Sequence, residues 1–551
     1  MTNSQIADIF YELSKLLEIK GDNPFKIRAY INAADTIKGY GVSIEKMLKE
    51  GQDLTKIPSI GKEIAKKIEE IVKTGKLRKL ELLKQEIPPT LEELLAIEGL
   101  GAKRVKRLYQ ELHITNLQEL KEAALKGEIA KLKGFGIKIQ DKILQGLKLT
   151  KQAGFRHIYA DAEPYAEAIV EYLQKSNYTI SVTVAGSFRR RKETVGDLDI
   201  LCTSNKPLEL IEHFVKYKDI LKVISAGSTR STIVLKNNLQ IDLRVVEQNS
   251  YGSALHYFTG SKAHVIKIRD MALDMGLKVN EYGIYKNNDL IASKNEEEVY
   301  RAFNLSYIEP ELRENRGEIE AARDNRLPKL ITMQDIKGDL HINCNIKDIK
   351  SLANEAIKKG YSYIGVSIDK KSIKESIKII DTLNKSFNNF RILKTMEVAI
   401  LEDGSLEIKE SILKELDIVH AAIKSAFDLD KTIQTARLIK AINNPLVNII
   451  SHLTARVINK QEPISFDFKK VIESGVKREI YFEIDARANR ADMPDYMIKE
   501  AKVLGAKFSI ASNASSADEL ANIKYGVFQA RRGWLEKDDV INTNINLNST
   551  Y

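Results

Sequence analysis

Apolar and polar residues alternate along the chain with two different periods. A period of two, typical of strands, occurs around Val182 and Val184, in GDLDIL (196–201) and in LQIDLRVV (239–246). In the last third of the chain, the strand patterns YIGVSI, VNIIS, IYFEIDA and KFSIAS are separated by helical patterns such as SLANEAIKKG and MIKEAKVLG. Strands that alternate with helices form parallel sheets, so we predict a parallel β/α barrel in this region.

A tight turn followed by a helical pattern occurs three times in the first 150 residues. The copies are IPSIG before KEIAKKI, IEGLG before AKRVKRL, and LKGFG before IKIQDKI. Glycine lets a phosphate approach the backbone closely, and the first N–H groups of the following helix can bind that phosphate. The pattern predicts helix-hairpin-helix modules that grip a DNA backbone without reading its sequence, unless the turns merely end helices. The residues assigned to DNA on this basis are Ser59, Gly61, Gly99, Gly101, Gly134 and Gly136.

Length and charge narrow the class of protein. The chain has 551 residues, more than a single hydrophobic core usually supports, which predicts three or more domains. The formal net charge is +10, and residues 1–150 hold 23 Lys and 4 Arg against 21 Asp and Glu, a balance of +6. A basic N-terminal region favours a polyanionic partner, although a soluble lysine-rich surface would give the same balance.

Export and membrane insertion find no support in the sequence. The chain holds no apolar run near the ~20 residues that a membrane span needs. The N-terminal stretch MTNSQIADIFYELSKLLE has the pattern of an amphipathic helix and not of a signal peptide. Cys202 and Cys344 cannot make a disulfide framework, which fits a reducing cytosol. We therefore expect a cytoplasmic protein without a membrane partner.

Three aspartates form the strongest candidate for catalysis. On a strand, Asp197 and Asp199 project from one face while Leu198 points into the core. Asp242 stands on the polar face of the second alternating segment. If the two strands are neighbours, the carboxylates form a site for two hard divalent cations, Mg²⁺ or Mn²⁺. Such a site activates a hydroxyl and stabilises a leaving pyrophosphate, and the alternative is three solvated acids at a strand edge.

A glycine–serine turn and a basic cluster lie between the first predicted strand and these acids. Gly186 and Ser187 follow the strand, and Arg189, Arg190, Arg191 and Lys192 come directly after them. We expect the turn and Arg190 to hold a nucleotide triphosphate, because guanidinium groups and free backbone N–H groups bind phosphate oxygens.

The run GSFRRRKETVGDLDIL resembles the signature of family X DNA polymerases, members of the nucleotidyltransferase superfamily. The resemblance continues through QIDLRVV, YFTGS (257–261) and GLKVNEYGIY (276–285). It implies that Tyr257 and Phe258 select the sugar and that Arg269 checks the minor groove of the new pair. Val265 and Arg230 replace the family's usual Asn and Lys, and neither change removes a metal ligand. The nucleotide contacts implied are Gly186, Ser187, Arg190, Gly196, Tyr257, Phe258, Gly260, Arg269 and Arg156.

Residues 1–85 resemble the small lyase domain of the same family. The resemblance rests on NPFKIRAYINAADTI (23–37) and on the first hairpin, and it implies a 5′-phosphate site made by Lys26, Arg28 and Tyr30. Lys67 aligns with the lysine that removes 5′-deoxyribose phosphate, a nucleophile that needs a lowered pKa, which the neighbouring lysines 62 and 66 could cause. The alternative is that Lys67 simply faces phosphate. Glu63 departs from a basic position of the family.

The C-terminal part resembles the PHP domain that follows the polymerase in bacterial family X enzymes. In active members this domain carries three metals and trims 3′ ends or removes 3′-phosphates. Here Asn343 replaces a ligand His, Lys424 replaces another, and NAS (513–515) replaces the closing Asp-Ala-His. We predict a domain without metals or nuclease activity, unless His420 and Asp369 rebuild a site. The residual ligand positions are His341, Glu397 and His452.

These patterns predict a multidomain chain of α+β and α/β type. It would combine helical helix-hairpin-helix DNA-binding domains, a nucleotidyltransferase palm with a thumb, and a C-terminal PHP-type β/α barrel. The expected boundaries are 1–85 for the lyase-like domain, 86–150 for the second helix-hairpin-helix part, 151–250 for the palm, 251–315 for the thumb-type part, 316–335 for a linker and 336–551 for the PHP-type domain.

The expected activity is template-directed filling of short gaps in DNA repair. Two Mg²⁺ or Mn²⁺ ions would lie at the aspartate triad, where Asp242 would also accept the proton of the primer hydroxyl. Gapped or nicked double-stranded DNA and dNTPs would be the partners of a monomer associated with the bacterial nucleoid. Two alternatives stay open, a non-catalytic scaffold that binds DNA gaps and a template-independent terminal transferase.

Overall fold

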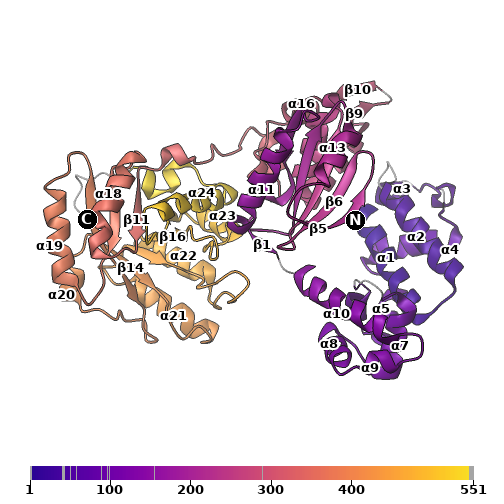
Figure 1. The fold of residues 1–551 in the computed structure, drawn as a ribbon, viewed down its shortest axis with the longest axis horizontal. Helices are drawn as coiled ribbons and strands as arrows, with labels where there is room; N and C mark the ends of the chain where they lie inside the picture. Colours follow the sequence, from indigo (N-terminus) through magenta and orange to yellow (C-terminus); the bar gives the residue numbers. More distant parts are fainter. Residues whose placement is uncertain are drawn as a thin grey trace. The chain divides into compact units, whose positions relative to one another are not determined.

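The chain divides into two compact units. The computed structural model describes residues 3–39, 44–49, 51–57, 59–88, 90–95, 97, 100–153, 156–287 and 289–544 (Figure 1). One unit comprises Met1–Arg156, Ile268–Val279 and Tyr285–Asp289, and the other comprises His157–Lys267, Asn280–Ile284 and Leu290–Tyr551. Within the described ranges, no helix is both long enough and apolar enough to cross a membrane.

The first 150 residues fold into short helices around one apolar core. Phe10, Ile68 and Leu108 are fully buried in this core, which the apolar positions of each helix face. Helices α4 and α7 begin directly after the glycines of the first two predicted turns, and α10 begins within the third. The helices are α1 (Asn3–Lys20), α2 (Pro24–Gly39), α3 (Ile44–Lys49), α4 (Lys62–Thr74), α5 (Arg78–Glu86), α6 (Leu91–Leu94), α7 (Ala102–Leu112), α8 (Leu117–Leu125), α9 (Glu128–Lys131) and α10 (Gly136–Ala153).

A five-stranded sheet follows, with the order β2-β4-β7-β6-β5. Strands β4 and β7 run parallel, and β2 pairs with β4 in the antiparallel sense. Helices α11 (Tyr159–Gln174) and α13 (Pro207–Phe214) pack on this sheet through one shared apolar cluster (Figure 1). The strands are β2 (Ser181–Val184), β4 (Asp197–Thr203), β5 (Ile220–Ala226), β6 (Arg230–Leu235) and β7 (Gln240–Val246); the short strands β1 (His157–Ile158) and β3 (Thr194–Val195) pair separately.

The segment between the sheet and the barrel is folded. It holds α14 (Tyr251–Thr259), α15 (Lys262–Asp274), β8 (Leu277–Asn280), β9 (Gly283–Lys286), β10 (Asp289–Ala292), α16 (Glu296–Ala302) and α17 (Glu318–Arg323). Part of it, residues 316–335, is expected from the sequence to be a linker. There Glu318 is fully buried and its carboxylate lies 2.6 Å from Nδ1 of His264, so this segment packs onto the structure before it.

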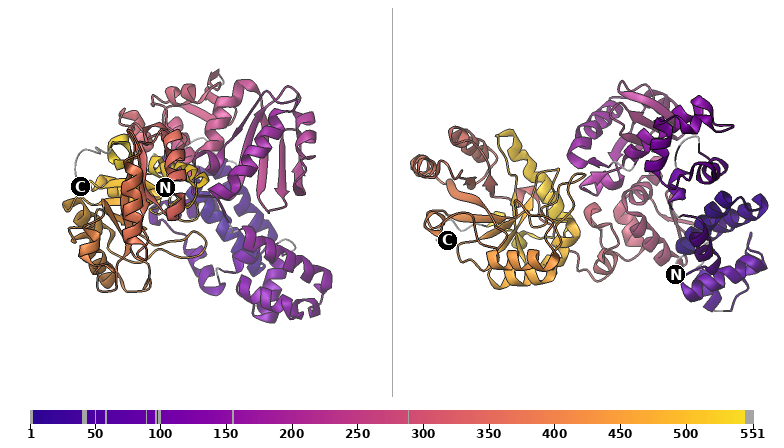
Figure 2. Two further views of the ribbon diagram at one scale, coloured as in Figure 1. Left: turned by 60° about the vertical axis from the view of Figure 1, so that its left-hand side comes forward. Right: turned by 90° about the horizontal axis from the view of Figure 1, so that it is seen from below.

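The C-terminal region is a nearly closed parallel barrel, and the prediction from its alternating strands and helices is confirmed. Its seven strands follow one another in sequence order, and helices surround them (Figure 2). The first and last strands meet where Asn513 N donates to His341 O and Asn343 N donates to Ala514 O. The strands are β11 (Gly338–Ile342), β12 (Tyr363–Ser367), β13 (Arg391–Ala399), β14 (Ile418–Ala422), β15 (Ile449–Ser451), β16 (Tyr481–Asp485) and β17 (Lys507–Ala511). The helices are α18 (Ile349–Lys358), α19 (Ile373–Asn384), α20 (Glu410–Leu413), α21 (Lys431–Ile442), α22 (Phe468–Lys477), α23 (Asp495–Val503) and α24 (Ile523–Arg532).

Candidate functional site

The structure brings the three predicted aspartates together on neighbouring strands. Strands β4 and β7 lie side by side in parallel, and the register sets Asp199 opposite Asp242. Leu198 and Ile241, which alternate with these acids, are fully buried, so the carboxylates of both strands project to the other face. Carboxylate oxygens of Asp197, Asp199 and Asp242 all lie within 4.8 Å of one another.

Burial and mutual repulsion make this triad a candidate cation site. Burial raises the pKa of Asp199 to about 7, and the neighbouring carboxylates of Asp197 and Asp242 add to the shift. Asp242 is held in place by Thr232 Oγ1, which donates to one oxygen at 2.5 Å, and by Gln240 Nε2, which donates to the other at 2.7 Å. The possible ligand atoms of the triad are all carboxylate oxygens, so the three aspartates fit hard divalent ions such as Mg²⁺ or Mn²⁺.

Gly186 begins a single helical turn, α12 (Gly186–Arg189), directly above Asp199. Its φ is +60°, and a Cβ at this position would lie 2.1 Å from Oδ2 of Asp199. The backbone N–H of Ala185 donates to the Asp199 carbonyl at 2.7 Å, which ties the turn to the strand. Only glycine allows this close approach, and Ser187 is half-buried beside it.

The arginines after the turn are held by acids from later in the chain. Both guanidinium arms of Arg189 donate to Glu296, at 2.9 and 2.7 Å. Arg190 is 8% exposed and donates from Nε to Glu314 at 2.9 Å and from Nη1 to the Thr259 carbonyl at 2.8 Å. A guanidinium has five N–H donors, and these two bonds use two of them.

The remaining predicted nucleotide contacts lie on α14, in the turn after it, and elsewhere in the chain. Tyr257 and Phe258 are half-buried near the end of α14, and the guanidinium of Arg244 lies 4.8 Å from the Phe258 ring centre. A Cβ at Gly260 would lie 2.9 Å from His264, so the turn after α14 is tightly packed. Gly196 is half-buried directly before β4. Arg156 and Arg269 are exposed and belong to the first compact unit.

The residues of the three turns differ in backbone angle and in the space around them. Ser59 and Gly134 occupy equivalent places, and both have positive φ, +65° and +87°. Gly61 and Gly101 are the N-caps of α4 and α7 with ordinary extended backbone angles, and a Cβ built on either would meet no heavy atom of the described residues within 4 Å. The fold therefore does not require these two glycines. Gly136 has a φ of +63°, and Gly99 lies outside the described residues.

A cluster of lysines surrounds a buried tyrosine in the N-terminal part. Tyr30 is 5% exposed, with Nζ of Lys79 at 5.4 Å and Nζ of Lys67 at 6.0 Å from its ring centre. Lys26, one helical turn before Tyr30 on α2, lies 3.1 Å from Asp22. Arg28 stands two residues from both, which sends it to a different face of the helix.

Lys79 is a candidate nucleophile that the sequence did not suggest. Burial, together with the nearby positive charge of Lys26, lowers the pKa of Lys79 to about 8. Lys67, the residue named by resemblance, lies 3.2 Å from the carboxylate of Glu63. No pattern in the sequence distinguishes Lys79 from the other lysines, because its environment depends on how α5 packs against α2.

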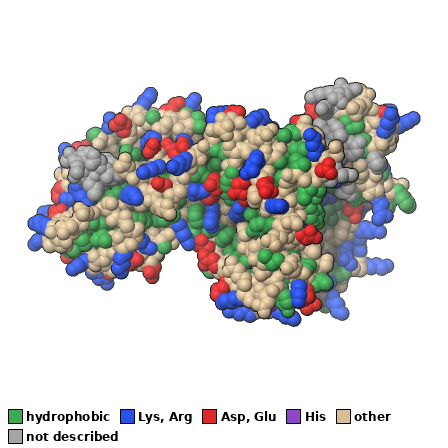
Figure 3. Space-filling view, turned by 90° about the horizontal axis from the view of Figure 1, so that it is seen from above, with side chains coloured by type: hydrophobic (Ala, Val, Ile, Leu, Met, Phe, Trp, Pro, Cys, Tyr) green, Lys and Arg blue, Asp and Glu red, His purple; other side chains and the backbone are tan. Residues whose placement is uncertain are grey.

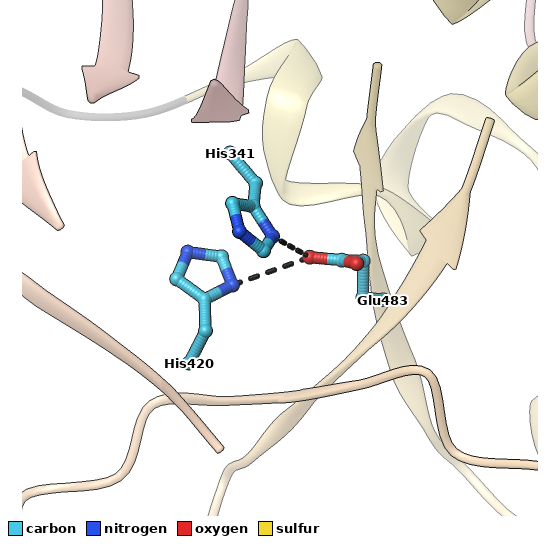
Figure 4. A group of neighbouring side chains, drawn as sticks. All are labelled: His341, His420 and Glu483. Carbon is cyan, nitrogen blue, oxygen red and sulfur yellow. Dashed lines mark hydrogen bonds and ion pairs between the residues drawn. The ribbon is translucent and has the colours of Figure 1, made fainter. Parts of the chain in front are cut away.

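The centre of the C-terminal barrel is a network of buried ion pairs. Glu483 accepts from Nδ1 of His341 at 2.8 Å and lies 3.2 Å from Nδ1 of His420 (Figure 4). Glu397 lies 2.9 Å from Nε2 of His452 and 2.7 Å from Nζ of Lys424.

The same network reaches Asp485, and it is larger than the sequence suggested. Asp485 lies 3.1 Å from Nδ1 of His452 and 2.8 Å from Nη2 of Arg487. The expected survivors His341, Glu397 and His452 are therefore joined by His420, Glu483 and Asp485, while Asp369 is exposed on the loop after β12. The alternation in IYFEIDA, which sends Glu483 and Asp485 to one face, was a signal that could have found both acids.

Positive charges stand where a cluster of metals would need neutral imidazoles and unpaired carboxylates. Burial alone would lower the pKa of His452, but Asp485 and Glu397 outweigh it and raise the pKa to about 10. Lys424 and Arg487 neutralise the same two carboxylates. Ligand atoms of His341, His420 and Glu483 lie within 4.8 Å of one another and could hold one ion. The residues present therefore do not fit a cluster of several metals.

Comparisons with known proteins agree with this geometry. Residues 159–266 match the family model of the DNA polymerase beta palm, and residues 254–314 match that of the DNA polymerase beta thumb. Residues 1–77 match a helix-hairpin-helix domain, and residues 51–113 and 91–149 match a SAM-like helix-hairpin-helix tandem. Fold and site thus define a nucleotidyltransferase that polymerises DNA.

Whole-chain similarity gives the family. The chain is 34% identical over 561 residues to DNA polymerase/3′-5′ exonuclease PolX of Bacillus subtilis, covering 98% of this chain and 97% of the relative. The chain belongs to the family X DNA polymerases. It is 24% identical to DNA polymerase lambda of Rattus norvegicus, covering 56% of both chains. It is 23% identical to DNA nucleotidylexotransferase of Xenopus laevis, covering 56% of this chain and 68% of the relative.

Proposed function

We propose that this polymerase fills short gaps in DNA during repair, with dNTPs as substrates and gapped or nicked double-stranded DNA as partner. The observation that carries the proposal is the half-buried triad on β4 and β7, next to a turn whose glycine touches Asp199. The helix-hairpin-helix turns support a grip on the DNA backbone on both sides of a gap. We expect a monomer that acts on the bacterial nucleoid in the cytoplasm.

The proposed mechanism uses the triad to hold two divalent cations. Bound there, Mg²⁺ or Mn²⁺ would favour the ionised primer hydroxyl and neutralise the leaving pyrophosphate. Asp242, fixed by Thr232 and Gln240, would accept the proton of the primer hydroxyl. The turn at Gly186 and Ser187, with Arg190, would hold the triphosphate, and Tyr257 and Phe258 would contact the sugar.

Primer extension across a single-nucleotide gap with a 5′-phosphate tests the activity. We expect Asp197→Ala to lower the rate by ~10³-fold or more, because the remaining carboxylates cannot hold both cations. Asp219→Ala, which removes a half-exposed acid of the same sheet region, serves as the matched control and should leave the rate unchanged. A wild-type chain that binds gapped DNA without extending the primer would favour the scaffold instead. Extension without a template would favour the terminal transferase.

A second activity, removal of 5′-deoxyribose phosphate, is proposed for the lysine cluster around Tyr30. Lyase chemistry needs an uncharged amine near a 5′-phosphate site, and Lys26 lies one turn before Tyr30 on α2. Lys67 and Lys79 are the two candidate nucleophiles, and the lowered pKa of Lys79 favours the latter. Borohydride trapping of each alanine variant on DNA with a 5′-deoxyribose phosphate identifies which amine reacts.

We also propose that the C-terminal barrel has no 3′-5′ exonuclease activity, although the Bacillus subtilis relative carries that activity in its name. The support is the substitution of ligands by Asn343 and Lys424 and the neutralisation of Glu397 and Asp485 by basic side chains. A labelled primer with a mismatched 3′ end, incubated with Mn²⁺ and no nucleotides, should stay intact. Shortening that persists in Asp197→Ala but is lost in His341→Ala would show a working nuclease.

A further inference from the structure

The C-terminal barrel grips the segment that links the nucleotide turn to the catalytic strand. Residues 190–193 follow α12 and lead through β3 to Asp197. Helix α24 of the barrel and the loop after β15 place four side chains on this segment, namely Phe528, Gln529, Arg532 and Arg456. All of these residues belong to one compact unit.

Arg532 is connected to Arg190 by one direct hydrogen bond and by a second path through Glu314. Its Nη1 donates to the Arg190 carbonyl at 2.7 Å. Its Nη2 donates at 3.1 Å to Oε1 of Glu314, the same oxygen that accepts from Nε of Arg190. Glu314 thus bridges two arginines, and Asp495 accepts from the same nitrogen, Nη2 of Arg532, at 2.5 Å.

The bridge is almost removed from water. Arg532 is 2% exposed, and the side chain of Glu314 is 11% exposed. Burial alone would raise the pKa of Glu314, but Arg532 and Arg190 outweigh it and the pKa lies below its ordinary value. Charged hydrogen bonds in such surroundings are directional, so a change in one guanidinium displaces the other.

The next residues are held by α24 and by the loop after β15. Arg191 has a positive φ of 55°, and its guanidinium lies 4.5 Å from the centre of the Phe528 ring. Glu193 accepts from both arms of Arg456, at 3.1 and 2.5 Å, and from Gln529 Nε2 at 3.2 Å. Three of the four residues 190–193 are therefore fixed by the barrel, although the centre of the barrel has lost several of the expected metal ligands.

We propose that the barrel is a working part of the nucleotide site, with Arg532 as a positioning residue that orients Arg190 through Glu314 and the Arg190 carbonyl. This rests on the proposed role of Arg190 as a triphosphate contact. It gives the C-terminal domain a function that does not depend on metals, namely to hold the segment after the Gly186–Ser187 turn in place.

Nucleotide binding and gap filling by the full-length Arg532→Lys variant test the proposal. Lysine keeps the positive charge beside Asp495 and Glu314, but a single amine cannot hold both and also reach the Arg190 carbonyl. We expect the KM for dNTP and the equilibrium Kd for dNTP to rise about 10-fold, while kcat and the Kd for gapped DNA change less than about 3-fold. A general loss of folding would instead lower kcat and the number of binding sites for both dNTP and DNA.

Arg531→Lys is the matched control on the same helix. Arg531 is bonded to Glu311 and to the Ile331 carbonyl and not to residues 190–193. We expect it to lower the melting temperature without changing the affinity for dNTP. Equal dNTP affinities of Arg532→Lys and the wild type would overturn the positioning role.

The proposal and the polymerase function fail in distinguishable ways. A wild-type chain that binds dNTP but does not extend primers would overturn the gap-filling function alone, and the affinity of Arg532→Lys would still decide the positioning role. A wild-type chain that binds no dNTP would overturn both. If Arg532→Lys does not fold, Phe528→Leu keeps an apolar side chain but removes the ring beneath Arg191, and we expect a KM increase of about 3-fold. An unchanged KM in that folded variant would overturn the proposal.

Discussion

Gly186 shows how closely a single residue can control the carboxylate triad. An added methyl group would lie 2.1 Å from Oδ2 of Asp199, and the φ of +60° would also strain any other residue. We expect Gly186→Ala to lower the rate of gap filling by about 10²-fold, because a displacement near 1 Å is enough for such a loss. The measurement is kcat on a single-nucleotide gap, together with the melting temperature.

Gly360→Ala separates backbone strain from the clash. Gly360 has a φ of +80°, and its Cβ would meet no atom of the described residues within 4 Å. We expect this variant to lose about 1–2 kcal/mol of stability through strain, as Gly186→Ala does, but to keep its activity. Equal activity of the two variants would mean that the contact with Asp199 has no catalytic consequence.

The pH dependence of the lyase reaction can distinguish the two candidate lysines. Only the uncharged amine attacks an aldehyde, and the pKa of Lys79 is lowered to about 8. If Lys79 is the nucleophile, trapping should rise with pH, reach half its maximum near pH 8 and level off above it. Trapping that is lost in Lys67→Ala but kept in Lys79→Ala would contradict this assignment.

At the residue scale, the sequence predicted which face of a strand a charged side chain occupies, but not how deeply a side chain is buried or which partners it has. Asp197, Asp199 and Asp242 could be found because strand alternation alone decides the face of each side chain. Lys79 could not, because its lowered pKa arises from burial between helices that are not adjacent in sequence. Glu314 could not either, since nothing local shows that it accepts from two arginines.

At the scale of elements, the N-caps of α4 and α7 are both glycines, and the fold gives no reason for glycine at either position. Gly61 and Gly101 have room for a side chain and need no special backbone angle. A phosphate that approaches the helix N-terminus would explain both glycines. We expect Gly61→Ala with Gly101→Ala to weaken binding to gapped DNA about 10-fold, at a stability cost below about 1 kcal/mol for each cap. Fluorescence anisotropy and thermal unfolding measure the two effects.

The N-cap of α8 provides the opposite case. Asn116 accepts from the N–H groups of Gln118 and Glu119, so its side chain serves the helix itself. Asn116→Ala should cost about 1 kcal/mol and leave DNA affinity unchanged. If the glycine variants bound DNA as tightly as the wild type, the turns would be helix punctuation and not a phosphate site.

The barrel centre makes a prediction about charge balance. Arg487 compensates the fully buried Asp485, and its removal would leave that carboxylate without its nearest guanidinium. We expect Arg487→Met to destabilise the barrel by about 3 kcal/mol. Added Mn²⁺ or Zn²⁺ should then raise the melting temperature of the variant more than that of the wild type, because a cation replaces the lost charge. Arg478→Met, at an exposed arginine after α22, is the control and should show neither effect.

Helices and strands could be predicted where apolar residues repeat with a single period along a segment. The alternation of strands and helices was enough to predict the parallel barrel, and the repeated turns were enough to predict the starts of α4, α7 and α10. The linker expected at 316–335 stays a prediction, and its polar residues are typical of exposed helices. In the structure, however, Glu318 is buried against His264, a tertiary pairing that no local pattern encodes.

For the whole molecule, residues 1–150 supply +6 of the net charge of +10, and the rest of the chain supplies +4. On the face drawn in Figure 3, Lys and Arg side chains are interspersed with Asp and Glu. DNA affinity should therefore come from particular phosphate contacts. If the three turns neutralise roughly six phosphates, the affinity should fall by about 10³-fold between 50 and 200 mM salt.

Single lysines can locate the salt-dependent contacts. Lys103, exposed in the first turn of α7, should reduce the slope of log K against log salt by about 1 when it is changed to alanine. Lys371→Ala, at an exposed position of the barrel, should leave the slope unchanged. Equal slopes for both variants and the wild type would contradict a phosphate contact at α7.

The bond between Arg532 and the Arg190 carbonyl joins positions 342 residues apart in the chain. A ribosome that adds roughly 5–20 residues per second needs on the order of 20–70 s to cover that interval. For most of this time the palm of a nascent chain has been made, but the helix proposed to support its Gly186–Ser187 turn has not. If Arg532 positions Arg190 as proposed, the order of synthesis delays completion of the nucleotide site until almost the whole polypeptide exists.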